Sequence, residues 1–94
     1  MNLVETFKEE KIAINCETEH EAEKFIKWCD DNKLEVKKDT RLNSFHRYNQ
    51  KTCYEYNYDN YEENSRIVYY GSSDYFEEKE GYKVIKYKDF LRKV

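Results

Sequence analysis

The chain lacks proline altogether and contains only two glycines in 94 residues. Phosphate-binding loops and dinucleotide-binding turns need several closely spaced glycines, so neither motif can be written from this sequence. Turns and helix starts must instead use Asn, Asp and Ser. Gly81 follows a short helical pattern and stands where a helix ends in a left-handed conformation.

Long apolar runs are also missing, because no stretch approaches the roughly 20 residues needed to cross a bilayer. The first residues, MNLVETFKEEK, carry acids where a signal peptide has a basic start and an apolar centre. The three cysteines form no C-x-x-C pair, which suits a reducing compartment better than a disulfide scaffold. We therefore expect a cytoplasmic protein, in the cytoplasm of a host cell, with no membrane partner.

Metal-binding and catalytic signatures are equally scarce. The candidate ligands Cys16, His20, Cys29, His46 and Cys53 contain only one close pair, C-x3-H, whereas structural zinc sites normally show two. A Cys–His nucleophile would need proximity and a third orienting group, and nothing in the spacing indicates either. The sequence predicts no metal, no cofactor and no enzymatic activity.

Aliphatic residues are few, and tyrosine supplies much of the apolar bulk. Aromatic residues make up 17% of the chain, and nine of its ten tyrosines lie between Thr52 and Tyr87. Tyr54, Tyr56 and Tyr58 recur with a period of two, which is typical of a half-buried strand. Each aromatic ring can bury a large area, so we expect residues 1–94 to fold as one domain.

The main helix is predicted over Glu19–Asn32. Thr18 and Glu21 fit a capping box at its start. An apolar stripe follows at helical spacing, at Ala22, Phe25, Ile26 and Cys29. Short helices are expected within Met1–Lys11 and over Tyr75–Glu80, and a final turn of helix over Asp89–Lys93.

Five segments have the pattern of strands: Lys11–Cys16, Leu34–Lys38, Thr52–Tyr58, Arg66–Tyr70 and Tyr82–Tyr87. Asp39–Gln50 is expected to be a loop, and Asp59–Asn64 an acidic connection. The order predicts an α+β domain with a single small, mixed and largely antiparallel sheet of about five strands. One main helix and one or two short helices should lie mainly on one face.

The net charge of −3 is unevenly distributed along the chain: residues 33–51 carry a net charge of +4 and residues 52–81 a net charge of −6. The basic segment interleaves cations with aromatic rings: Arg41, Phe45, Arg47, Tyr48 and Lys51. Cations that meet phosphate and rings that stack on bases are how single strands and nucleotides are held. The competing interpretation is a solvated loop whose Phe45 reaches the core, and it is favoured because the charge is modest for a phosphate-driven binder.

The acidic segment predicts the opposite kind of partner. Its acids are Glu55, Asp59, Glu62, Glu63, Asp74, Glu77, Glu78 and Glu80. The residues expected to bind a partner protein are Tyr58, Asp59, Tyr61, Glu62, Glu63, Tyr75, Glu77 and Glu78. Carboxylates can occupy a groove lined by Lys and Arg, and tyrosines supply the buried anchors of an interface. A surface whose acids serve only solubility would have the same composition.

Four strings carry a resemblance that spans most of the chain: KIAINC followed by TEHEAEKF, KTCY, YYGSSDYF and GYKVIKYKDF. In these strings the chain resembles small, mostly uncharacterised accessory proteins of phages and prophages of low-GC Gram-positive bacteria. Such proteins, when acidic and without an active site, are often host-interaction factors, among them inhibitors of CRISPR effectors and other defences. The resemblance carries over no site residue, and it implies a context by analogy.

Together these observations predict a stoichiometric binding protein that inhibits a host nucleic-acid-handling defence complex, either a protein or a ribonucleoprotein. The alternative is a small nucleic-acid or nucleotide binder that uses the basic segment. A homodimer is a third possibility, because the sheet has edges that could pair between two copies.

Overall fold

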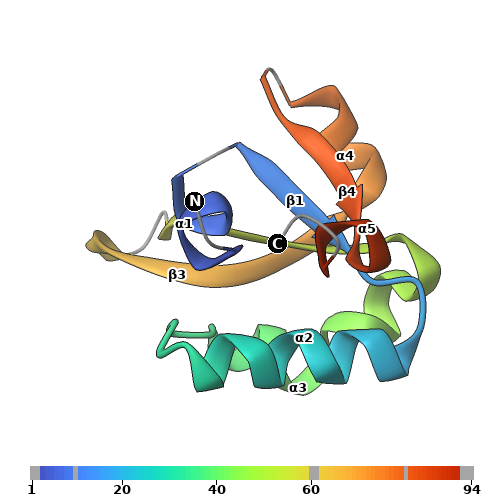
Figure 1. The fold of residues 1–94 in the computed structure, drawn as a ribbon, viewed down its shortest axis with the longest axis horizontal. Helices are drawn as coiled ribbons and strands as arrows, with labels where there is room; N and C mark the ends of the chain where they lie inside the picture. Colours follow the sequence, from blue (N-terminus) through green and yellow to red (C-terminus); the bar gives the residue numbers. More distant parts are fainter. Residues whose placement is uncertain (1–2, 10, 60–61, 80, 92–94) are drawn as a thin grey trace.

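The structure, a computed structural model, describes residues 3–9, 11–59, 62–79 and 81–91, without the side chains of 9, 39, 42–44, 58–59 and 62–65. The elements in order are α1 (Leu3–Glu9), β1 (Ile12–Asn15), α2 (Glu19–Asp31), α3 (Lys38–Tyr48), the 3-10 turn η1 (Asn49–Lys51), β2 (Thr52–Asp59), β3 (Glu62–Ser72), α4 (Ser73–Glu78), β4 (Lys83–Lys86) and α5 (Tyr87–Leu91). Figure 1 shows their arrangement. The predicted α+β class is confirmed.

The described strands form one mixed sheet of four strands in the order β3-β2-β1-β4. β2 pairs antiparallel with both β3 and β1, while β4 pairs parallel with β1. The fifth strand expected at Leu34–Lys38 is wrong. That segment makes only one isolated parallel bridge, between Val36 and Val68.

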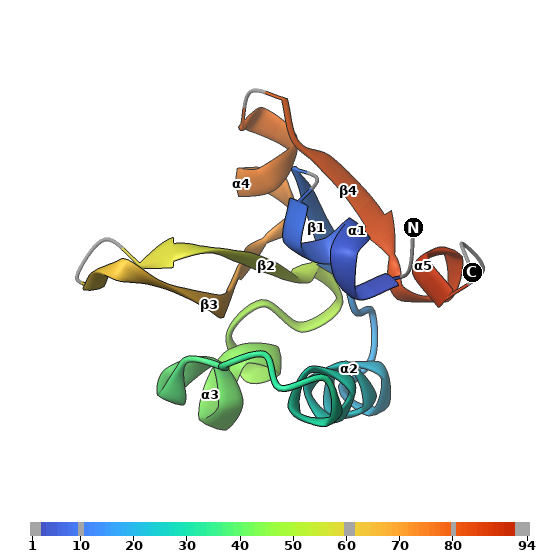
Figure 2. The same cartoon turned by 60° about the vertical axis from the view of Figure 1, so that its left-hand side comes forward.

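The two faces of the sheet have different cores. Ile12, Ile14, Tyr54 and Val68 point to the main core, which also contains side chains from α1, α2, α3 and α5. The opposite face holds a smaller cluster in which Ala13 and Cys53 pack against Phe76 of α4. In Figure 2, α2 and α3 accordingly lie on one side of β2 and β3, with α4 on the other.

Phe25 of α2 is the hub of the main core. Its ring stacks on Tyr54 of β2 at 5.3 Å between centroids and on Trp28 at 5.6 Å. Phe7 of α1 and Phe90 of α5 meet it edge-on, at 5.3 Å and 6.4 Å. Aromatic contacts of this kind join α1, α2, β2 and α5 into one core, where aliphatic side chains are few.

Helix α2 has the predicted start. The Thr18 hydroxyl accepts a hydrogen bond from the backbone N–H of Glu21 at 3.1 Å. The carboxylate of Glu21 reaches one residue further back than expected, to the N–H of Glu17 at 2.9 Å. At the other end, Lys33 adopts φ 59°, and the N–H groups of Lys33 and Leu34 cap the carbonyls of Asp30 and Cys29.

The loop expected at Asp39–Gln50 is also wrong, because α3 and η1 occupy this segment. Without proline or glycine the backbone has nothing to interrupt a helix. Among the described side chains of α3, Phe45 packs on the main core, Tyr48 packs on Tyr70 and Thr40 is fully buried, so the sequence of this helix carries only a weak apolar period. Near the other end of the chain, Gly81 has the predicted positive φ, 80°.

Candidate functional site

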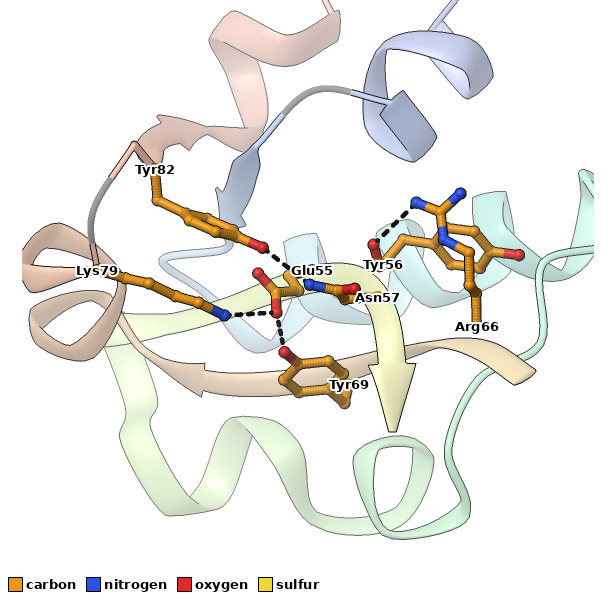
Figure 3. Close-up of polar contacts among 7 residues, drawn as sticks. All are labelled: Glu55, Tyr56, Asn57, Arg66, Tyr69, Lys79 and Tyr82. Atoms are coloured by element: carbon orange, nitrogen blue, oxygen red, sulfur yellow. Dashed lines mark hydrogen bonds and ion pairs between the residues drawn. The ribbon is translucent and has the colours of Figure 1, made fainter. Parts of the chain in front are cut away.

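A buried carboxylate lies on the α4 side of the sheet. Glu55 sits in β2 between Tyr54 and Tyr56, which face the main core, so strand alternation turns Glu55 to the opposite face. Only 1% of Glu55 is exposed. Its Oε1 atom accepts hydrogen bonds from the Tyr69 hydroxyl and, at 3.2 Å, from the Lys79 ammonium (Figure 3). Because a buried charge without a partner is expensive, this carboxylate depends on Lys79.

The Lys79 ammonium is held by aromatic rings as well as by Glu55. It lies 4.4 Å from the ring centroid of Tyr82 and 5.7 Å from that of Tyr75. Burial opposes the charged form of Lys79, but the Glu55 carboxylate outweighs this effect and the pKa of Lys79 is raised. Lys79 directly follows α4, and its backbone N–H donates to the carbonyl of Phe76, which fixes where the side chain starts.

The polar groups around this pair complete what we call the Glu55 cluster: Glu55, Asn57, Tyr69, Lys79 and Tyr82. The Asn57 amide donates to the Tyr82 hydroxyl at 3.2 Å. Burial, and then the neighbouring Glu55 carboxylate, raises the pKa of Tyr82. The second carboxylate oxygen, Oε2, is buried and accepts no hydrogen bond of normal geometry from the described residues.

Beside the cluster, helix α4 presents what we call the α4 face: Tyr75, Glu77 and Glu78, all exposed. Tyr75, at 53%, and Leu91, at 44%, are the two exposed large hydrophobic residues in the described part of the chain. Glu78 lies about one helical turn from Tyr75, so its carboxylate is the neighbour of the exposed ring, while Glu77 is exposed on another side of the helix. An exposed ring with a carboxylate beside it is the kind of surface that anchors a protein partner. These are three of the eight residues predicted to bind a partner.

The other five predicted residues cannot be placed on this surface. The backbones of Tyr58, Asp59, Glu62 and Glu63 belong to β2 and β3, but their side chains lie outside the described part of the structure. Tyr61 lies outside the described residues altogether. Of the other acids, Glu55 is buried rather than exposed, and Asp74 pairs with Lys51 at 2.9 Å.

The residues of the predicted nucleic-acid site lie on α3 and η1 rather than on a loop. Arg41 makes a bidentate ion pair with Asp30 of α2, at 2.6 and 2.8 Å. The Arg47 guanidinium lies 5.8 Å from the ring centroid of Tyr48, and Tyr48 packs on Tyr70 of β3. With Lys51 bound to Asp74 and Phe45 packed on the main core, the structure gives most of this set a partner within the chain.

Another cation–aromatic contact lies on the main-core side of β2 and β3. The Arg66 guanidinium lies over the ring of Tyr56 (Figure 3), 4.6 Å from its centroid. It also donates to the carbonyl of Lys8 at the end of α1. This arginine joins α1 to β2 and β3, which makes it a packing residue.

The Glu55 cluster was not predicted from the sequence. Glu55 alternates with Tyr54 and Tyr56, so the pattern places it on the face opposite to the tyrosines, where an acid is expected to meet water. In the structure α4 covers this face, and a charge buried there needs a partner. Nothing in the sequence selects Lys79 as that partner, because the two residues lie 24 positions apart.

The cysteines are buried thiols. Cys16, Cys29 and Cys53 are free and 0% exposed. Burial is the main cause that raises all three thiol pKa values, that of Cys53 to about 12. Because the thiolate is the reactive form, these groups are poor nucleophiles at neutral pH. The described residues contain no group of three His, Cys, Asp or Glu side chains that could hold a metal ion.

These shifts predict that the protein loses stability in alkali. The folded state holds the protons of Cys53 and Tyr82 more tightly than the unfolded chain, whose thiols and phenols titrate near pH 8.5 and 10. Their contribution is therefore fully present below about pH 8 and is lost as the pH rises through the folded pKa values. The urea midpoint should fall steadily above about pH 8.5.

The matched control is the triple variant Cys16→Ala/Cys29→Ala/Cys53→Ala, followed by tryptophan fluorescence. Its midpoint should start lower, because core volume is lost, but it should fall less steeply with pH. If the urea midpoint fell equally steeply with pH in the wild-type protein and in the triple variant, the thiols would not be the cause of the alkaline loss of stability.

No helix of the described chain is both long and apolar enough to cross a membrane. Searches against protein-family models, curated proteins and solved structures found no match to the chain. The resemblance to phage accessory proteins therefore stays a prediction, and the α4 face and the Glu55 cluster are the features of the described structure that bear on function.

Proposed function

We propose that this chain is a stoichiometric binding protein, encoded by a phage or mobile element, that inhibits a nucleic-acid-handling defence complex in the host cytoplasm. The binding surface is the α4 face. The observation that carries the proposal is the exposure of Tyr75 on a short helix that also exposes Glu78, about one turn away, and Glu77. Proteins that handle nucleic acids carry basic grooves, so carboxylates around an aromatic anchor match them in charge and in chemistry.

Two further features support binding rather than catalysis. In the Glu55 cluster the carboxylate and the ammonium neutralise each other, which leaves neither free to act as an acid or base. The thiols are buried and protonated at neutral pH. The alternative, nucleic-acid binding by Arg41 and Lys51, has less support because both cations are engaged by carboxylates of the same chain.

The experiment expresses the chain in bacteria that each carry one defence system and counts phage plaques. Wild-type chain should restore plaque formation against at least one system. The variant Glu77→Lys/Glu78→Lys should lose this effect, because reversed charges repel a basic partner.

The matched control is Glu23→Lys/Glu35→Lys, which makes the same change in net charge at exposed positions outside the α4 face. Glu23 lies on α2, on the other side of the sheet from α4 (Figure 2). The control should protect phage as well as the wild-type chain does. The proposal would be overturned if the α4 variant protected phage as well as the wild-type chain does. It would also be overturned if the wild-type chain protected phage against none of the defence systems.

A further inference from the structure

The Glu55 cluster has the construction of a cation-binding cage. The Lys79 ammonium lies against the rings of Tyr82 and Tyr75, at 4.4 and 5.7 Å, with the Glu55 carboxylate beneath it at 3.2 Å. Aromatic faces combined with a carboxylate are how proteins recognise cationic ligands. Here the occupant is a side chain of the same protein, tethered just after α4.

Lys79 fits this cage incompletely. Its ammonium bonds to Oε1 of Glu55, the atom that also accepts from Tyr69. Oε2 is buried and accepts no hydrogen bond of normal geometry from the described residues, and the polar group nearest this side of the carboxylate is the Tyr82 hydroxyl, whose pKa is raised by burial and by Glu55 (Figure 3). An arginine guanidinium presents two parallel N–H groups that match both oxygens of a carboxylate, and it stacks on aromatic rings better than an ammonium does. The carboxylate is therefore better suited to a guanidinium than to Lys79.

Lys79 can also leave. Its side chain is 30% exposed, against 1% for Glu55, so its ammonium can swing into water while the carboxylate cannot. Tyr75, whose ring lies 5.7 Å from the Lys79 ammonium, is 53% exposed, so this side of the cage borders solvent. Glu77 and Glu78 of the same helix are exposed, and carboxylates near a site raise the local concentration of cations.

We propose that the Glu55 cluster is an arginine-binding site, and that an arginine of the partner protein displaces Lys79 when it docks on the α4 face. This inference rests on the proposed function and adds the chemistry of the contact. Glu55 bonds the guanidinium, Tyr82 and Tyr75 flank it, and Lys79 keeps the buried carboxylate neutralised while the partner is absent.

The test uses the Lys79→Ala variant and ethylguanidinium as the probe, with binding followed through the ring resonances of Tyr82 in NMR spectra. The empty cage should bind the probe saturably in the millimolar range. Wild-type protein should bind it roughly tenfold more weakly or worse, because the tethered Lys79 competes at high effective concentration. Propylammonium should bind Lys79→Ala more weakly than ethylguanidinium, and neutral ethylurea should not bind.

The control is Glu55→Gln/Lys79→Ala, which keeps the rings but removes the carboxylate, and it should show no saturable shift. Equal binding of ethylurea and ethylguanidinium, or equal binding by the control, would overturn the proposal. If the Lys79→Ala variant does not fold, the titration of wild-type protein with ethylguanidinium tests the proposed site instead. Ethylguanidinium must then shift the Tyr82 resonances saturably and leave those of Tyr70 unchanged, and no shift at Tyr82 refutes the cage.

Because these titrations contain no partner protein, their outcome is independent of the plaque assay. If ethylguanidinium does not bind but the charge reversal on α4 abolishes phage protection, only the proposed arginine contact is refuted. If ethylguanidinium binds saturably but the wild-type chain does not protect phage, the guanidinium site stands and the proposed inhibition of a defence complex is refuted.

Discussion

Replacing Lys79 by alanine should lower the free energy of unfolding by about 3 kcal/mol, at the lower end of the cost of breaking a buried ion pair because Lys79 is partly exposed. The variant leaves the Glu55 carboxylate buried and without its cation, with only the neutral hydroxyls of Tyr69 and Tyr82 near it. Glu55→Gln should cost only about 1 kcal/mol. In that variant Lys79 can turn its ammonium to water, and the amide oxygen can still accept from Tyr69.

Urea denaturation of both single variants and of the double variant measures this asymmetry. In the Glu55→Gln background, Lys79→Ala should cost about 1 kcal/mol or less, because no buried charge is left behind. Equal losses for the two single variants would mean that Glu55 reaches water when Lys79 is removed. The description of Glu55 as a dependent buried charge would then be wrong.

The elements that could be predicted from the sequence are those with strong local signals. Helix α2 combines a capping box with an apolar stripe at Ala22, Phe25 and Cys29, and all three side chains are buried. Strand β2 shows the expected alternation, with Tyr54 facing the main core and Glu55 facing α4. In both cases a local repeat decides which side chains are buried.

Helix α3 could not be predicted for the opposite reason. Its described apolar contacts are few, Phe45 on the main core and Tyr48 on Tyr70 of β3, and the bidentate pair between Arg41 and Asp30 that ties it to α2 joins residues 11 positions apart. The expected strand at Leu34–Lys38 failed in a related way. Its alternation is real, since Leu34 and Val36 are both buried, but the backbone meets β3 only around Val68. Periodicity reports burial, whereas strand pairing depends on neighbours distant in sequence.

The candidate site was predicted only in its exposed part. Tyr75, Glu77 and Glu78 are exposed, as their composition and place in the acidic segment indicated. The buried part depends on β2, β3 and the end of α4 coming together, which places Glu55, Tyr69 and Lys79 in contact. Several cations in the chain could have matched Glu55 in charge, so residue chemistry alone does not select one.

Tyr75→Ala should weaken binding to the defence complex by about thirtyfold, equivalent to about 2 kcal/mol, because it removes the exposed aromatic anchor of the α4 face. Stability should change by no more than about 0.5 kcal/mol, since the side chain is more than half exposed. The loss arises mainly as faster dissociation, because truncating a central contact changes the off-rate more than the encounter rate. Surface plasmon resonance with the purified complex measures both rates.

The most direct test of the central claim, that the α4 face is the binding surface, compares Tyr75→Ala with Leu91→Ala in calorimetric titrations of that complex. Leu91 is the matched control, since it is a large hydrophobic residue of similar exposure, 44%, on α5. We predict one bound chain per complex, a roughly thirtyfold loss for Tyr75→Ala and no loss for Leu91→Ala. Equal affinity of Tyr75→Ala and the wild-type chain would contradict the account.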